Sequence, residues 1–388
     1  MQTEIRKSKK WLAGWGALCV ILLVIASAAV WQVDPFFHFH APDTERYYYV
    51  LDNQRSQNDG LLRQFDFDGI ITGTSMTHKF LSTEMDGLFG TNSIKASFAG
   101  GSYREINEML EKAFRLHPEL KVVIRSLDLD QLVSEKDRMR DGVFPSYLYD
   151  ENSLNDVKYL LNRDVLFKRV LPMWLDAMRG REPGITSFDE YGAGQAPCGR
   201  LSATLDGIAV KPAGAPIHLT EEERELIRGN IEQNVTALAN AHPEADFYYF
   251  FTPYSILWWQ NLLENGEIYR ETEAEEYAAS LILKYPNIHL FCFSCRTDII
   301  TDLNNYSDPI HYAEWINSLI LRWMHEESYR LTEDNYESFF QRELEFYKDF
   351  DYESLIDQVD YEDDREAVRL LEAELTGETD SVQPVWEP

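Results

Sequence analysis

An uncharged apolar run near the N-terminus constrains the fold of this chain more than any other feature. It extends from Trp11 to Trp31 and follows four basic residues, Arg6, Lys7, Lys9 and Lys10. About 20 apolar residues in a helix can cross a bilayer, and a helix in a soluble core would need a polar face. Positively charged residues that flank a membrane span stay on the cytoplasmic side. The sequence therefore predicts a single-pass protein of the cell membrane, with a cytoplasmic segment 1–10, a membrane-spanning signal anchor 11–31 and an extracytoplasmic remainder.

A cleaved signal peptide is the alternative interpretation of this run. Ala26, Ser27 and Ala28 form a small-x-small sequence, which is typical of a cleavage site after an apolar core. The length of the run and the tryptophan at its outer end favour an uncleaved anchor.

The charge of the chain excludes some partners. The formal net charge is −30, which argues against general affinity for nucleic acid or anionic lipid, because lysine and arginine hold such partners. The sequence shows no basic patch after the N-terminus. Residues 331–388 contain nineteen Asp and Glu against four Lys and Arg, with apolar residues recurring between them. We expect this segment to form acidic amphipathic helices that dock on the domain or on a protein partner.

Five short apolar runs of strand character alternate with helical segments. They begin near residues 70, 92, 120, 247 and 288. This alternation predicts an α/β fold with a doubly wound, mainly parallel five-stranded sheet in a domain that covers residues 32–330. A helical insertion rich in glycine and proline toward its end, at about 135–216, resembles a lid.

A serine follows the first predicted strand at a tight turn. Ile70–Thr72 is followed by Gly73, Thr74 and Ser75. The carboxyl ends of parallel strands are where ligands bind in α/β sheets, so Ser75 is a candidate nucleophile. Thr74 or Ser75 as a simple helix cap explains the same residues.

A possible base and acid come after the last predicted strand. Asp308 and His311 are three residues apart, with Pro309 at what we expect to be the first position of a helix. A carboxylate beside an imidazole fixes its tautomer and stabilises the imidazolium. Asp308 could instead be the helix N-cap.

Glycines and aromatic residues end two other predicted strands. Gly100 and Gly101 precede Ser102, which with Glu105 matches a capping box. Tyr254 ends the fourth strand, and the adjacent Trp258 and Trp259 suggest either core packing or sugar binding. Cys292 and Cys295 could pair or remain buried thiols, and without a histidine cluster we expect no metal and no cofactor.

These motifs together resemble the SGNH, or GDSL-like, hydrolase superfamily. Within it they are similar to membrane-anchored members related to surface-polysaccharide O-acetyltransferases and to the alanyl-transfer protein of teichoic acid synthesis. The similarity covers roughly residues 67–321, and Gly-Thr-Ser-Met and Asp-Pro-Ile-His are its most specific parts. It implies an SGNH/flavodoxin-like sheet, Ser75 as nucleophile, His311 as base and Asp308 as its orienting residue.

The resemblance also implies how the substrate is bound. The N–H groups of Ser75 and Gly101 would be oxyanion donors. Because Thr74 and Tyr254 lie at the carboxyl ends of the first and fourth predicted strands, we also expect them beside the substrate. The Gly-x-Asn-Asp block is absent, and Ser126-Leu-Asp128 stands in its place. We expect an esterase or acyltransferase acting on acyl esters, such as those of a cell-surface glycan. The alternatives are a non-catalytic component of a cell-envelope complex and a glycan-binding module.

Overall fold

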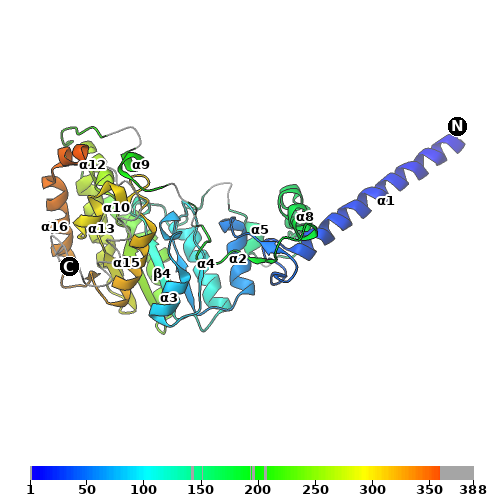
Figure 1. Ribbon diagram of the computed structural model, residues 1–388, viewed down its shortest axis with the longest axis horizontal. Coiled ribbons are helices and arrows are strands. Elements are labelled where there is room, and N and C mark those ends of the chain that lie inside the picture. Colours follow the sequence, from blue (N-terminus) through cyan, green and yellow to red (C-terminus); the bar gives the residue numbers. More distant parts are fainter. Residues whose placement is uncertain are drawn as a thin grey trace. The chain divides into compact units, whose positions relative to one another are not determined.

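The computed structural model (Figure 1) describes residues 2–140, 144–150, 152–192, 194, 197–204 and 208–358. The chain divides into two compact units, one formed by residues 1–65 and 141–187 and the other by 66–140 and 188–388. The segment 141–187, which the sequence predicts as part of an insertion in one large domain, thus belongs to the same unit as the N-terminal residues.

The first unit contains the apolar helix α1 (Gln2–Val33). Its stretch Arg6–Val33 is long and apolar enough to cross a membrane, and most of it is exposed. The tyrosine strand β1 (Tyr48–Tyr49) pairs in parallel with β5 (Gly184–Ile185). The helices of this unit are α2 (Gln54–Gln64), α5 (Ser146–Tyr149), α6 (Val157–Leu160), α7 (Arg163–Val165), the π-helix η3 (Leu166–Val170) and α8 (Leu171–Met178).

The second unit is built on a six-stranded, mostly parallel sheet. Its strands are β2 (Gly69–Thr72), β3 (Ser93–Lys95), β4 (Val122–Leu127), β6 (Asp246–Phe251), β7 (Ile288–Cys292) and β8 (Arg330–Leu331). The order is β3-β2-β4-β6-β7-β8, and only β8 runs antiparallel to its neighbour. The prediction of a mainly parallel α/β sheet is confirmed. The count of five strands is wrong, because β8 is a two-residue edge strand and too short to give a pattern.

Helices of the second unit pack in two groups around this sheet. The helix α3 (Ser82–Phe89) packs on α15 (Glu314–His325). The other group consists of α4 (Tyr103–Leu116), α10 (Glu221–Ile231), the π-helix η4 (Glu232–Thr236), α11 (Ala237–Ala241), α12 (Ile256–Asn265), α13 (Ile268–Ile282) and α16 (Tyr336–Asp349). Fully buried aliphatic and aromatic residues of the strands, such as Ile70, Ile124 and Phe250, form the core.

Short helical turns complete the second unit. They are η1 (Ser75–Thr77), η2 (Leu129–Gln131), α9 (Arg200–Thr204), α14 (Thr297–Ile300), η5 (Leu303–Asn305) and η6 (Tyr352–Asp357). The capping box predicted for Ser102 and Glu105 is present at the start of α4. It satisfies backbone N–H groups that the first helical turn leaves unpaired.

The acidic C-terminal segment docks on the sheet unit through α16. Phe339, Phe340 and Tyr347 are buried, and Tyr347 stacks on Trp259 with ring centroids 4.0 Å apart. Residues 336–349 therefore form a helix with one side buried and the other exposed. Residues 359–388, on which the remainder of the predicted acidic amphipathic segment falls, lie outside the described residues.

Buried carboxyl groups make this docking sensitive to pH. Glu343 of α16 is fully buried opposite α13, which contributes the buried Glu271 and Glu275. Burial and the like charge of its neighbours raise the pKa of Glu275, and burial raises the pKa of Glu343. A carboxyl group with a raised pKa stabilises the folded state at low pH, and this stability is lost as pH rises through the folded pKa.

Glu343→Gln is therefore expected to raise the free energy of unfolding at pH 8, by roughly 1–3 kcal/mol, because it removes a buried charge. At pH 5 the change should be small. Urea unfolding at both pH values measures the difference, with the exposed Glu345→Gln on the same helix as the matched control. Equal effects of Glu343→Gln at the two pH values would contradict the prediction.

Candidate functional site: a serine, a histidine and an aspartate at one sheet edge

The turn after β2 presents Ser75 at the start of η1. Gly73 has a φ of +146°, and a Cβ there would lie 2.2 Å from the Oγ of Ser126. Only glycine permits this approach between the ends of β2 and β4. The Oγ of Thr74 caps the turn by accepting the N–H of Met76 at 3.3 Å. Ser75 itself is partly exposed, so its hydroxyl is open to a reactant.

A second turn carries Asp308 and His311. The N–H of Ser307 donates to the carbonyl of His311 at 2.9 Å, and the Oγ of Ser255 donates to the carbonyl of Pro309 at 2.7 Å. The turn is thus closed on itself and attached to the chain that follows β6. The expectation that a helix begins at Pro309 is wrong, because α15 begins only at Glu314.

The two turns bring three predicted residues together. Ser75 Oγ lies 2.8 Å from His311 Nε2, and His311 Nδ1 lies 2.6 Å from Asp308 Oδ2. The carboxylate accepts the proton on Nδ1, so Nε2 is left to accept the serine proton. Ser75 and His311 are 236 positions apart in the chain.

The backbone also holds Asp308 in its ionised form. Its Oδ1 accepts the N–H groups of Ile310 and His311, both at 2.9 Å. Partial burial raises the pKa of Asp308, but the hydrogen bonds from His311 and from the two N–H groups outweigh it and lower the pKa overall. The carboxylate is therefore charged at neutral pH and can stabilise an imidazolium beside it.

Asp128 supports the turn that carries Ser75 through hydrogen bonds. In the sequence it attracts notice only because it stands where the Gly-x-Asn-Asp block is absent. Its Oδ1 accepts the hydroxyl protons of Thr74 at 2.6 Å and Tyr254 at 3.3 Å, and its Oδ2 accepts that of Ser126 at 3.0 Å. Burial, followed by the charge of Asp130, raises the pKa of Asp128 to about 6. The signal that could have revealed it is the pattern Ser-x-Asp at the carboxyl end of β4.

Thr74 and Tyr254, two predicted substrate-binding residues, meet at Asp128. Both residues are buried, with 4 % of Thr74 and 2 % of Tyr254 exposed. Their hydroxyl groups are engaged by the carboxylate, so in this structure they orient the turn that carries Ser75.

The predicted oxyanion donors differ in their availability. Ser75 N–H has no acceptor within the described part of the chain. Gly101 N–H donates to the carbonyl of Phe98 at 2.8 Å and closes a turn in which Gly100 has a φ of +56°. In this structure Gly101 N–H thus already donates to a backbone carbonyl. Loss of one such donor typically costs about 3 kcal/mol of transition-state stabilisation.

Two buried basic groups lie next to these residues. Lys95 donates from Nζ to the carbonyls of His78, Phe80 and Asp189, at 2.5, 2.9 and 3.0 Å. Burial lowers the pKa of Lys95 to about 8. Burial, with the charges of Lys95 and His311, lowers the pKa of His78 to about 4, so His78 is neutral at pH 7.

The cysteine pair and the tryptophan pair singled out in the sequence lie mostly in the core. Cys292 and Cys295 are buried free thiols, and Trp259 is buried in the core against α16. Trp258 is partly exposed and contacts Tyr254 edge to face at 4.9 Å. Within the described residues, no group of three or more His, Cys, Asp or Glu is arranged to hold a metal ion.

Comparison with known proteins gives no relative of this chain. No family model, no curated protein and no solved structure matches it.

Proposed function

We propose that this protein is a serine esterase or O-acyltransferase that forms an acyl intermediate on Ser75. The observation that carries the proposal is the unbroken chain of hydrogen bonds from Ser75 Oγ through His311 to Asp308, at 2.8 and 2.6 Å. In such a chain the imidazole takes the serine proton as the hydroxyl attacks a carbonyl carbon, and returns it to the leaving group.

The order of the strands supports the proposal. Numbered along the chain, the five parallel strands lie in the order 2-1-3-4-5, which is typical of doubly wound, flavodoxin-like sheets. Ligands bind to such sheets where the order reverses, between the first and third strands. Ser75 follows the first of these strands and Asp128 the third.

The substrate class rests on the resemblance and on α1. A helix that crosses the cell membrane with basic residues at its inner end would place the catalytic unit outside the cytoplasm. We therefore propose acyl esters of a cell-surface glycan as substrates. Water as the acceptor gives an esterase, and a sugar hydroxyl gives a transferase.

Labelling with a fluorescent fluorophosphonate tests the nucleophile directly. The full chain in detergent should become labelled, and Ser75→Ala should lose the label. Ser338→Ala, an exposed serine on α16, is the control and should label like the wild type. Equal labelling of wild type and Ser75→Ala would disprove the assignment.

A second candidate function is a non-catalytic binding or assembly role in the cell envelope. The observation that favours it is the engaged N–H of Gly101, which leaves the site with one fewer free oxyanion donor than expected. This candidate predicts neither labelling nor turnover of acetyl esters by the wild type.

A further inference from the structure

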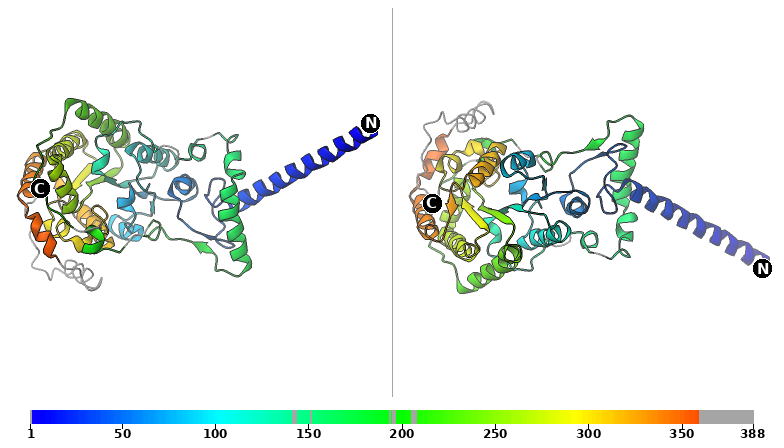
Figure 2. Two further views of the ribbon diagram at one scale, coloured as in Figure 1. Left: turned by 90° about the horizontal axis from the view of Figure 1, so that it is seen from above. Right: turned by 90° about the horizontal axis from the view of Figure 1, so that it is seen from below.

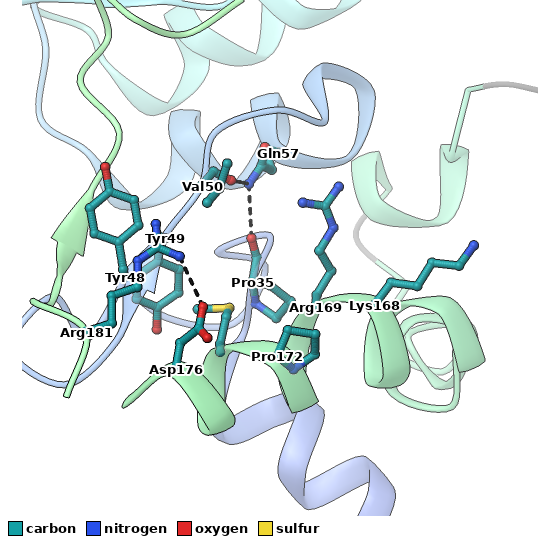
Figure 3. A pocket seen from close by; sticks show the side chains of 11 residues that line it. Pro35, Tyr48, Tyr49, Val50, Gln57, Lys168, Arg169, Pro172, Asp176 and Arg181 are labelled. Carbon is teal, nitrogen blue, oxygen red and sulfur yellow. Dashed lines mark hydrogen bonds and ion pairs between the residues drawn. The ribbon is translucent and has the colours of Figure 1, made fainter. Parts of the chain in front are cut away.

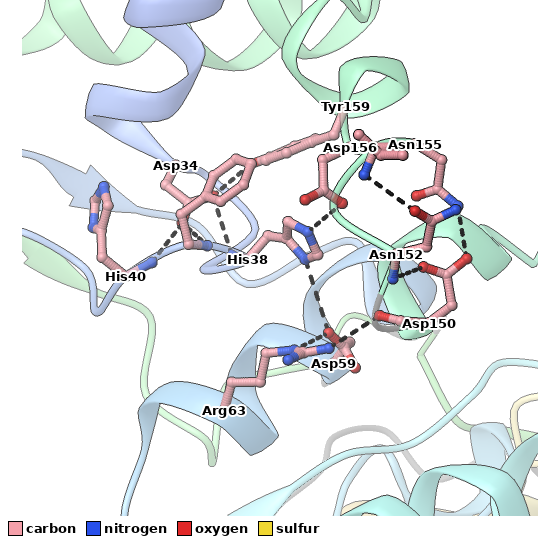
Figure 4. Close-up of polar contacts among 12 residues, drawn as sticks. Asp34, His38, His40, Asp59, Arg63, Asp150, Asn152, Asn155, Asp156 and Tyr159 are labelled. Atoms are coloured by element: carbon pink, nitrogen blue, oxygen red, sulfur yellow. Dashed lines mark hydrogen bonds and ion pairs between the residues drawn. The ribbon is translucent and has the colours of Figure 1, made fainter.

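The outer end of α1 is fixed rigidly to the unit that follows it (Figure 4). Asp34, directly after α1, is fully buried and accepts the N–H groups of His38, Phe39 and His40 at 3.1, 2.6 and 3.0 Å. It also accepts the hydroxyl of Tyr159 on α6 at 2.8 Å. The segment after the apolar run is thus locked to α6 and is not a loose tether.

A second contact strengthens the same connection. His38 Nε2 lies 2.9 Å from Asp156 Oδ1, immediately before α6. Phe36 stacks on Tyr159, with ring centroids 5.4 Å apart. Helix α6 and the π-helix η3 therefore pack directly on α1.

This packing fixes the distance of the helices from a membrane. A helix rises 1.5 Å per residue, so a span that begins at Trp11 reaches the opposite surface of a hydrocarbon core about 30 Å thick near Trp31. Ala29, Val30 and Val33 are buried against the rest of their unit. The elements that cover them must then lie at the level of the lipid headgroups.

The helical segment formed by α7, η3 and α8 crosses the outer end of α1, as both views of Figure 2 show. None of the eight residues of α8 is buried. Phe167, Leu175 and Met178 are 59, 45 and 76 % exposed, and they recur at helical spacing along one side. A soluble surface rarely leaves such a stripe uncovered.

The wider stretch 157–181, which contains this segment and its flanking residues, is basic within a strongly acidic chain. Residues 157–181 contain six Lys and Arg against two Asp, a net of +4, whereas the whole chain has −30. The net charge of the whole sequence does not reveal this local excess of lysine and arginine. Arg163, Lys168 and Arg179 have side chains 85, 71 and 74 % exposed.

A hollow of about 100 Å³ lies beside this segment and beside the exit of α1 (Figure 3). Lys168, Arg169 and Arg181 line it together with Pro35 and Tyr48. Arg169 pairs with Asp52 at 2.6 Å and Arg181 with Asp176 at 3.1 Å. Ion pairs near the surface contribute little to stability, so the phosphate group of a lipid can replace them.

We propose that the helical segment 163–178 lies on the membrane surface, with Phe167, Leu175 and Met178 among the upper acyl chains. Arg163, Lys168 and Arg179, which follows the segment directly, would then contact the phosphates of anionic phospholipids. The exposed apolar stripe, the local positive charge and the fixed position at the exit of α1 all favour this occupant. The contact requires that α1 crosses the bilayer. It does not depend on the proposed acyl chemistry.

Site-specific fluorescence tests this contact in the full chain. The exposed Cys19 and the partly exposed Cys198 are first replaced by serine, while Cys292 and Cys295 are buried and remain. Single cysteines at Phe167 or Met178 are labelled with an environment-sensitive dye in nanodiscs of phosphatidylglycerol and phosphatidylcholine. Nitroxide-bearing lipids should quench these labels, and aqueous iodide should not. A label at Leu116, an exposed apolar residue of the other unit, is the control for iodide access.

The charge component has its own comparison. Arg163→Gln, Lys168→Gln and Arg179→Gln combined should reduce lipid quenching in anionic nanodiscs to the level seen in pure phosphatidylcholine, and 0.5 M salt should do the same to the wild type by screening. Iodide quenching at positions 167 and 178 as strong as at 116, without lipid quenching, would overturn the proposal. Quenching that is equal in both lipids would overturn the role of the basic residues.

Discussion

Replacing His311 with alanine is expected to lower kcat for p-nitrophenyl acetate by about 10⁶-fold, the typical cost of losing the base of a serine–histidine pair. Ser75 Oγ would then have no acceptor for its proton at 2.8 Å. Because the two residues act as one unit, Ser75→Ala combined with His311→Ala should be no slower than either single variant. Asp308→Asn should cost about 10⁴-fold by favouring the wrong tautomer.

A matched histidine provides the control. His218 also has a carboxylate on Nδ1, that of Glu273 at 2.6 Å, but it lies on the surface. His218→Ala should therefore leave kcat unchanged. If His311→Ala and His218→Ala have the same rate, or if the double variant is slower by the product of the single effects, Ser75 and His311 do not work as a nucleophile and its base.

The positions of Ser75 and His311 could be predicted because they depend on a strong local signal. Each follows a buried apolar strand, and the carboxyl ends of parallel strands share one edge. The sheet does place β2 and β7 in one parallel array, with β4 and β6 between them. The hydrogen bond between the two residues could not be predicted from either segment alone.

The errors arose where a turn was closed by contacts distant in sequence or by backbone hydrogen bonds. The sequence suggests a helix start at Pro309, but the N–H of Ser307 and the hydroxyl of Ser255 hold the chain in a turn. The N–H of Gly101, which we expected to be an oxyanion donor, donates to the carbonyl of Phe98. Hydrogen-bond partners decide the local backbone conformation at such turns, and the residue types alone do not reveal those partners.

The grouping of residues 141–187 with the N-terminal unit also could not be derived from the sequence. It depends on single polar contacts such as that of Tyr159 with Asp34, 125 positions away. Helical periodicity indicates that a segment is a helix. It carries no information on which part of the chain that helix will cover.

Outside the chain of Ser75, His311 and Asp308, Asp128 is the residue whose replacement should affect catalysis most. Asp128→Asn keeps the shape of the side chain but presents an amide N–H₂ to hydroxyl groups that now donate to a carboxylate. At least one of the three hydroxyls, those of Thr74, Ser126 and Tyr254, must then change from donor to acceptor or lose its partner. Since misplacement of a reacting group by about 1 Å can cost 10²-fold, we expect kcat at pH 8 to fall by about that factor.

Stability and pH distinguish this positioning role from a merely structural one. Burial raises the pKa of Asp128 to about 6 in the folded state, so its contribution to stability is present at low pH and is lost as pH rises through 6. Asp128→Asn should therefore not lower the free energy of unfolding at pH 8, although it lowers kcat.

At pH 5 wild-type Asp128 is itself largely neutral, so the ratio of wild-type to variant kcat should shrink toward one. A constant ratio between pH 5 and 8, or a loss of stability that parallels the loss of kcat, would show that Asp128 only holds the fold together.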